Sequence, residues 1–477
     1  MSQKEISSFN AQTPGHSTGV TQKETGCVVL NKTLAVLVLL VFSILVLFER
    51  ADAQLLISGD FDARGEYLNL RRIVSDSLNS KSFNFSGSAE FDFGYRYKHF
   101  DSYLALLTSY SSGTNLFSYA NPGTFSGNAY QAWVSYQFSK WFSLQAGRIE
   151  LSYDDQRFFQ ARDWNHLVTS HNAVIAHWLA PDTNFMADLG VAANKFPGFA
   201  SNLNTEPTVN GYRYLGFLYA HKKTCDDKLL FTLTDICDAS DNGVSRSVLY
   251  GRNTLGLSTW LAWTDWNLFL TGFYQAGHIT DGRRLSAFYY SGYFGYQFTG
   301  WLGVMLAYEH MSGDNYADSA EWKKVVHGFS MLYGNSRKNM GLSGFFNAAY
   351  RTNINPGLNN LYLTTTFTVS DAISIEASYH WFSLPHAYMR ELDPVSGKYV
   401  VEKISSSLIH EADLLFTFTP VESLEIDLNY SLLFPGRSLS AFNGWNTNGN
   451  NMFSYAYLEV DFSPTLLGPK TKIKHLH

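Results

Sequence analysis

The chain is poor in charge, in cysteine and, beyond residue 53, in long apolar runs. Charged residues make up 16% of its 477 residues, against roughly 25% in soluble proteins. The formal net charge is −6, and it stays at −6 without the first 53 residues, which carry four basic and four acidic groups. Nucleic-acid binding normally needs a basic surface. We therefore expect no nucleic acid among the partners.

The three cysteines are Cys27, Cys225 and Cys237. Cys27 precedes a segment that we expect to be removed. The other two fall in a tight turn and at the outer end of the next predicted strand, roughly 40 Å apart. That separation is far beyond disulfide reach, so we predict two free thiols. A bridge between them would make this segment a single loop and change the strand count.

The one long apolar stretch is Leu34–Phe48, 15 residues that follow Lys32. It is short for a spanning helix, which needs about 20 apolar residues. Ala51-Asp52-Ala53 then offers a small-x-small cleavage site, which favours a signal peptide over an uncleaved anchor. We predict an exported protein with residues 1–53 as a signal peptide with a long leader, cleaved after Ala53.

Aromatic residues are abundant, at 16% of the chain, and beyond residue 53 they alternate with polar ones. In 83–98 the odd positions are mostly Phe and Tyr, and the even positions are polar or small; 422–432 and 411–418 repeat the pattern. Successive strand residues face opposite sides. A soluble sandwich also alternates, but runs of 10 to 14 residues exceed its usual strands and suit tilted membrane crossings.

We predict eighteen strands. They cover 55–70, 83–98, 100–110, 128–139, 141–151, 172–180, 184–194, 213–222, 228–236, 248–261, 265–277, 285–298, 301–311, 359–369, 373–382, 408–418, 422–433 and 451–462. Eight tight turns alternate with nine longer loops, as in bacterial outer-membrane barrels. None of the twelve prolines lies inside a predicted strand, as ladder hydrogen bonding requires. Residues 341–350 remain open between strand and loop.

The sequence therefore predicts an all-β fold, a transmembrane antiparallel β-barrel with short periplasmic turns and long extracellular loops. Residues 54–462 form the barrel and 463–477 a periplasmic C-terminal tail. Outward aromatics near strand ends, such as Tyr95, Tyr97, Phe416, Phe418 and Phe462, fit an interfacial girdle.

Three segments resemble the alginate export family of outer-membrane barrels. They are Gly147–Arg157 with Asp163-Trp164, Ser312-Gly313-Asp314 with Leu332–Asn335, and His410–Asp413 running into Ser423–Ser431. The resemblance covers most of the mature chain. It implies an eighteen-stranded channel in the bacterial outer membrane and periplasmic export partners.

Charge concentrates in the loop at 147–171, where guanidinium groups can grip carboxylates or sugar hydroxyls. The alternative is an internal Arg–carboxylate lattice that holds the loop against the wall. The candidate pore and constriction residues are Arg148, Glu150, Asp154, Asp155, Arg157, Trp164, His171, Arg252, Tyr333, Arg337 and Lys338.

Alternation along the predicted strands places more acidic than basic residues on the lumen side. The acidic ones are Asp60, Asp62, Glu66, Glu90, Asp92, Asp188, Glu376, Glu411, Asp413, Glu425 and Asp427, against Arg64, Arg96 and Lys98. A channel for a polyanion should present a positive potential. From the resemblance we therefore infer a conduit and not the substrate of the family.

Other chemistry has no support. Asp154-Asp155 lacks a third ligand at metal spacing, and no strained nucleophile turn accompanies the serines near His171 and His380. We expect no enzyme, cofactor or metal site. The sequence predicts a passive outer-membrane channel whose polar lumen is constricted by loops. Its candidate cargo is hydrophilic solutes, oligo- or polysaccharides among them. The alternative is a non-conducting barrel that acts as an adhesin or as a docking component of an export complex.

Overall fold

The computed structural model describes residues 53–69, 81–112, 125–161, 170–193, 212–224, 226–241, 248–315, 317, 324–334, 339–345, 356–392, 399–436, 438–439 and 452–468.

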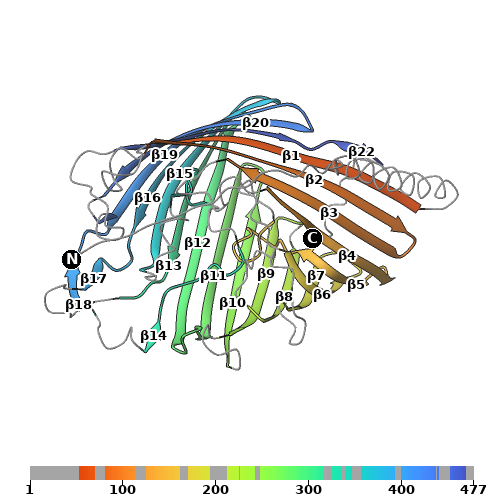
Figure 1. Ribbon diagram of the computed structural model, residues 1–477, viewed down its shortest axis with the longest axis horizontal. Coiled ribbons are helices and arrows are strands. Elements are labelled where there is room, and N and C mark those ends of the chain that lie inside the picture. The colour runs from red at the N-terminus through yellow and green to blue at the C-terminus, as the bar shows by residue number, and fades with distance from the viewer. Residues whose placement is uncertain are drawn as a thin grey trace, which may run out of the picture. The chain divides into compact units, whose positions relative to one another are not determined.

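Eighteen long antiparallel strands form a closed β-barrel (Figure 1). They are β1 (Ala53–Asn69), β2 (Lys81–Tyr97), β3 (Phe100–Ser111), β4 (Phe125–Ser139), β5 (Phe142–Glu150), β6 (Ser170–Leu179), β7 (Phe185–Ala193), β8 (Tyr214–Thr224), β9 (Leu229–Asp241), β10 (Leu249–Ala262), β11 (Trp266–His278), β12 (Arg284–Thr299), β13 (Leu302–Met311), β15 (Leu358–Ser370), β16 (Ile373–Ser383), β19 (Ser407–Val421), β20 (Leu424–Pro435) and β21 (Phe453–Phe462). Every predicted strand is present. The largest difference is in β9, which continues to Asp241 instead of ending near residue 236.

Each barrel strand pairs with the next one along the chain, and the circle closes where β1 meets β21. At this seam Phe61 is opposite Phe462 and Asn69 is opposite Ser454. The seam is the one place where strands from the two ends of the barrel sequence pair, so the fold depends on contacts across the whole chain.

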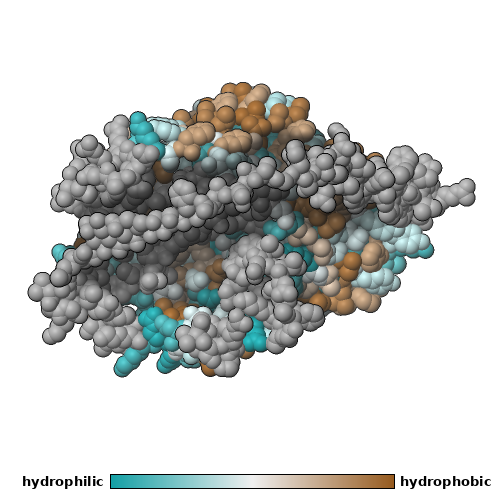
Figure 2. Space-filling view, viewed as in Figure 1, coloured by the Kyte–Doolittle hydropathy of each residue, from teal (hydrophilic) through white to brown (hydrophobic). Residues whose placement is uncertain are grey.

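The wall is apolar outside and polar inside. On β2, Phe83 and Phe85 are 68% and 45% exposed, whereas the alternate residues Asn84 and Ser86 are buried. Figure 2 shows hydrophobic side chains gathered on the outer surface of the wall. A soluble protein would bury these residues, so the polarity is that of a barrel with lipid around it and a polar lumen.

Aromatic residues lie near the tight turns, at the predicted girdle. Trp263 and Trp266 stack with centroids 5.6 Å apart beside the β10–β11 turn. Phe416 and Phe462 are 37% and 42% exposed on the outer face. Amphipathic rings at this level fit a membrane interface.

Four short strands lie where the sequence predicted loop or tail. They are β14 (Val325–Val326), β17 (Tyr388–Leu392), β18 (Tyr399–Lys403) and β22 (Thr465–Leu467). β17 and β18 form a separate hairpin, β14 lies parallel to β12, and β22 pairs with β1.

One local prediction needs correction, and one alternative that the sequence left open is decided for part of its range. Pro420 and Pro435 lie within the last residues of β19 and β20, so prolines are not confined to turns. The register shifts between Phe418 and Val421, which removes Pro420 from the regular ladder. Residues 341–345 form turns and no strand, and the rest of 341–350 lies outside the described residues.

Cys237 is a free, exposed thiol, and Cys225 lies outside the described residues. No helix among the residues that the structure describes is long and apolar enough to cross a bilayer.

Candidate functional site

Two loops fold into the lumen, residues 151–161 after β5 and, after β14, residues 327–334 with 339–345. The ring of Tyr153 stacks on Tyr219 of β8, with centroids 4.4 Å apart, and Phe158 lies 4.3 Å from Phe273 of β11. Tyr219 and Phe273 are buried residues on the inward face of the wall. A loop that starts at β5 and reaches β11 crosses the interior of the barrel.

The two loops contact each other inside the lumen. Phe159 and Tyr333 form a parallel β-bridge, and their rings stack with centroids 6.1 Å apart. A Cβ on Gly334 would lie 1.9 Å from the backbone oxygen of Arg157, so only glycine permits this close approach.

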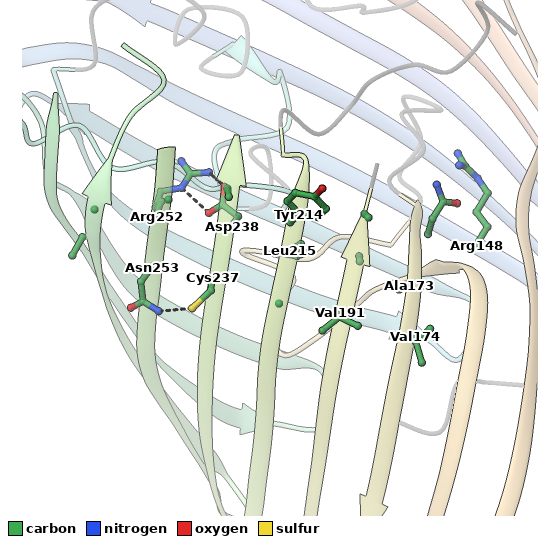
Figure 3. A pocket seen from close by; sticks show the side chains of 18 of the residues that line it. Arg148, Ala173, Val174, Val191, Tyr214, Leu215, Cys237, Asp238, Arg252 and Asn253 are labelled. Atoms are coloured by element: carbon green, nitrogen blue, oxygen red, sulfur yellow. Dashed lines mark hydrogen bonds and ion pairs between the residues drawn. The ribbon is translucent and has the colours of Figure 1, made fainter. Parts of the chain in front are cut away.

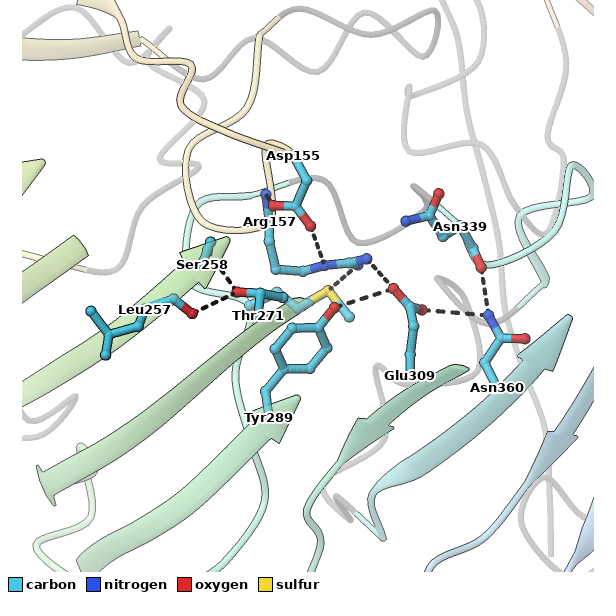
Figure 4. Close-up of polar contacts among 10 residues, drawn as sticks. Asp155, Arg157, Leu257, Ser258, Thr271, Tyr289, Glu309, Asn339 and Asn360 are labelled. Carbon is cyan, nitrogen blue, oxygen red and sulfur yellow. Dashed lines mark hydrogen bonds and ion pairs between the residues drawn. The ribbon is translucent and has the colours of Figure 1, made fainter. Parts of the chain in front are cut away.

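Arg157 fastens the first loop to the opposite wall (Figure 4). Its guanidinium forms an ion pair with Glu309 on β13, and both side chains are buried. The hydroxyl of Tyr289 donates to Glu309 over 3.2 Å, and the Asn360 amide lies 3.4 Å from the other carboxylate oxygen. Breaking a buried, hydrogen-bonded ion pair on one side leaves a charge uncompensated and is strongly destabilising. We therefore regard this pair as the main anchor of the loop.

Asp154 belongs to the same loop and contacts the inward face of the wall. Its carboxylate accepts hydrogen bonds from Tyr219 over 2.7 Å and from Thr232 over 3.2 Å. Desolvation by the surrounding protein, with a smaller contribution from Asp155, raises the pKa of Asp154 to about 6. This carboxyl group therefore titrates close to neutral pH.

His171 belongs to an aromatic cluster behind the loop. Its ring is fully buried and stacks on Tyr212, whose hydroxyl lies 2.7 Å from Nδ1. Tyr333 packs edge-on against both rings. These contacts give His171 a packing role at the end of β6.

Arg252 of β10 pairs with Asp238 of β9 through two hydrogen bonds of 2.9 and 2.8 Å (Figure 3). Burial and then the nearby Asp238 carboxylate raise the pKa of Tyr333. The pair therefore lies beside the second inward loop.

Arg148 does not join this group. Register places it opposite Ala132 and Asn172, which are exposed residues on the outer face of the wall. Glu150, two residues further, is buried at the end of β5, where its backbone N–H lies 3.5 Å from the Gln131 side-chain oxygen.

The second loop ends on a pair of lumen carboxylates. The backbone N–H of Ser343 donates to Glu411 over 2.9 Å, and that of Leu342 lies 3.4 Å from Asp413. A Cβ on Gly341 would lie 2.5 Å from the Glu411 carboxylate, and its φ is +78°. The acidic residues predicted to line the lumen here bind the loop.

A cavity of about 790 Å³ opens on the tight-turn side of the first loop. We call it the vestibule; its lining includes Ser135, Lys140, Asp154, Tyr219, Lys223 and Trp260. Lys140 lies over the ring of Trp141, 4.4 Å from its centroid. Among the described residues, neither Lys140 nor Lys223 forms an ion pair, whereas Asp101 and Asp155 pair with arginines. Asp154 is the one lining carboxylate without a cationic partner in the described part of the chain. Two unpaired lysines against one unpaired carboxylate leave the vestibule with net positive charge.

The structure thus gathers Asp154, Asp155, Arg157, Arg252 and Tyr333 around the inward loops. Trp164, Arg337 and Lys338 lie outside the described residues. The contacts of Arg157 agree better with the alternative of an internal Arg–carboxylate lattice that holds the loop than with ligand binding.

Sequence reasoning missed Glu309, Tyr289, Tyr212 and Asp238. Glu309 shares the inward parity of a predicted strand and was open to detection, whereas Asp238 lay beyond the predicted end of its strand. No metal-binding group of three or more His, Cys, Asp or Glu residues is present in the described part of the chain.

The closed wall, the apolar outer face and the loop-narrowed polar interior define a porin-like outer-membrane β-barrel. The family model described as alginate export matches residues 126–452, and the chain belongs to this family. Family and fold indicate a transport channel for solutes.

Solved structures share the fold. OccK9 (OpdG) of Pseudomonas aeruginosa has 10% sequence identity and a TM-score of 0.58, with 87% of this chain and 99% of that chain covered. A BenF-like porin from Pseudomonas fluorescens Pf-5 has 12% identity and a TM-score of 0.56, with 87% and 99% covered. OpdK of Pseudomonas aeruginosa, solved with vanillate, has 13% identity and a TM-score of 0.55, with 86% and 98% covered. No curated protein matches the chain in sequence.

Proposed function

We propose that the protein is a passive channel for hydrophilic solutes, including oligo- or polysaccharides, whose bore is set by the two inward loops. The observation that carries this proposal is the anchoring of loop 151–161 across the lumen through Arg157 and Glu309. Porins narrow their bore by such an arrangement of wall and loop.

The lining suits a polar, weakly charged solute. Buried carboxylates near the loops already have partners: Glu309 pairs with Arg157, Asp238 with Arg252, and Glu411 accepts a backbone N–H. Trp260, 40% exposed in the vestibule, offers a ring face, the kind of group that sugars contact. Lys140 and Lys223 favour entry of solutes that carry some negative charge.

Single-channel conductance in a planar bilayer tests the proposal. The wild-type protein should give defined current steps. Arg157→Gln should enlarge the steps and make them noisier, because the loop loses its anchor. The matched control is Arg283→Gln, since Arg283 forms an ion pair of 2.8 Å with Asp281 in the β11–β12 hairpin and takes no part in the Arg157–Glu309 anchor.

Absence of steps above leak from folded wild-type protein would refute the channel and favour an adhesin or a docking component of an export complex. Heat-modifiable electrophoretic migration checks folding of each variant. Glu309→Gln, which retains the shape of the side chain, serves as the second probe of the anchor.

A further inference from the structure

Four side chains of different chemical character follow one another on the outward face of β12, near the end of the strand that adjoins the long loop. Arg284, Ser286, Phe288 and Tyr290 lie two residues apart, so they point to the same side of the strand. Successive members are about 7 Å apart along it. The order from the rim toward the membrane centre is therefore cation, hydroxyl and two rings.

The rings form a flat stack with a neighbouring strand. His310 of β13 stacks on Phe288 and Tyr290, with centroids 5.3 and 4.8 Å away. Phe288 and Tyr290 are 46% and 45% exposed. His310 Nδ1 lies 2.7 Å from Asn359 Oδ1, an acceptor that fixes the ring. The stack is thus a rigid apolar platform that faces the lipid.

The hydroxyl group of Ser286 has a hydroxyl partner on β11. The Tyr274 hydroxyl and Ser286 Oγ lie 2.9 Å apart in an exposed pair. Two hydroxyl groups that satisfy each other through one bond retain further donor and acceptor capacity. They lie between the platform and the rim.

The rim itself is cationic. Arg284 is exposed, and its backbone N–H donates to the Lys324 carbonyl oxygen over 3.3 Å, which brings β14 beside it. Among the described residues Arg284 forms no ion pair, and the nearby Asp281 forms its ion pair with Arg283 over 2.8 Å. The charge of Arg284 is therefore unpaired within the part of the chain that the structure describes.

We propose that this outer-rim patch binds a phosphorylated glycolipid of the outer leaflet. The patch consists of Tyr274, Arg284, Ser286, Phe288, Tyr290 and His310. Arg284 pairs with the lipid phosphate, the two hydroxyls bond the sugar, and the stacked rings pack against the upper acyl chain. Charge, hydroxyl and ring follow one another in the order in which such a lipid presents phosphate, sugar and hydrocarbon. This inference does not depend on conduction.

The chain supplies a matched control on another wall. Lys81 of β2 lies above Phe83 and Phe85 on an outward face. Lys81, Phe83 and Phe85 give this column one cation and no hydroxyl side chain. The basic residue that the structure describes on a neighbouring strand, Arg64 of β1, is buried. Lys81→Gln removes the same charge from the same level without touching the outer-rim patch.

The experiment measures glycolipid retained by the folded full-length protein after purification in mild detergent and mixing with bisphosphorylated lipid A. Arg284→Gln should retain about tenfold less than wild type, and Lys81→Gln should match wild type. Dephosphorylated lipid A should bind wild type as weakly as it binds Arg284→Gln. Inorganic phosphate alone should not displace the lipid, because the rings hold its hydrocarbon.

Equal retention by all three proteins, or equal binding of the dephosphorylated lipid, would overturn the inference. Full displacement by inorganic phosphate would show a site for free phosphate and would also overturn it. Conductance steps of Arg284→Gln should remain as in wild type, which separates this result from a failure of the channel proposal.

Discussion

At the scale of single residues, the inward loops are held by a few polar side chains that lie inside the barrel and come from distant parts of the chain. Arg157 and Glu309 are 152 positions apart in sequence, yet they form a buried pair. The sequence singled out Arg157, because arginine in a pore loop is conspicuous. It could not identify the partner, since nothing local to residue 157 specifies which inward carboxylate it will meet.

The titration of Asp154 gives a residue-scale prediction. Because its pKa is raised to about 6, lowering the pH from 7.5 to 5 neutralises one carboxylate beside the vestibule. Permeability to anions relative to cations should then rise. In Asp154→Asn this pH dependence should be lost. Reversal potentials under a salt gradient measure both.

The same raised pKa has a consequence for stability. The folded protein holds the Asp154 proton more tightly than the unfolded chain, so the stabilising contribution is complete below about pH 4 and declines as the pH rises through 6.

An unchanged selectivity in wild type between pH 7.5 and 5 would contradict this assignment.

At the scale of the strand, hydrophobic alternation was enough to locate all eighteen barrel strands. The pattern works because one face meets lipid and the other water, as Leu257 at 66% exposure and Ser258 at 7% illustrate. The short strands β14 and β17 escaped prediction because they stand in long loops, where no lipid imposes a period of two. The loop contacts escaped for a related reason: Gly334 and Gly341 serve close approaches that only the folded chain creates.

Opposite faces of the wall should respond differently to charge. Leu257→Arg, on the lipid face, should lower the free energy of unfolding by about 2–4 kcal/mol. Ser135→Arg, in the water-filled vestibule, should change it far less. Urea unfolding in lipid vesicles, followed by tryptophan fluorescence, gives both values. A comparable loss at the two positions would argue against a lipid-facing Leu257.

At the scale of the whole molecule, the chain combines a family-specific sequence with a common porin-like architecture. Matches at 10–13% identity carry the fold alone, so the solute and the direction of transport rest on the experiments above. The class of protein was accessible from sequence because it depends on composition and period, whereas selectivity depends on a handful of contacts.

Export makes a prediction for the intact protein. If residues 1–53 are a signal peptide, the protein isolated from outer membranes should begin at Gln54. Intact-mass measurement and sequencing of the N-terminal peptide test this. Ala53→Leu should slow cleavage, because the site requires a small residue. A mature protein that retains Leu34–Phe48 would show an anchor instead.

The pairing of Phe61 with Phe462 has a bearing on assembly. Until those two strands meet, each carries a row of unsatisfied backbone groups, which hydrocarbon does not tolerate and which invite pairing with foreign strands. Some 400 residues lie between these two strands, so both strand edges stay unpaired until the rest of the barrel has formed. Assembly of the barrel therefore has to protect two unpaired strand edges. Any molecule that pairs with either edge should leave the protein as an open sheet.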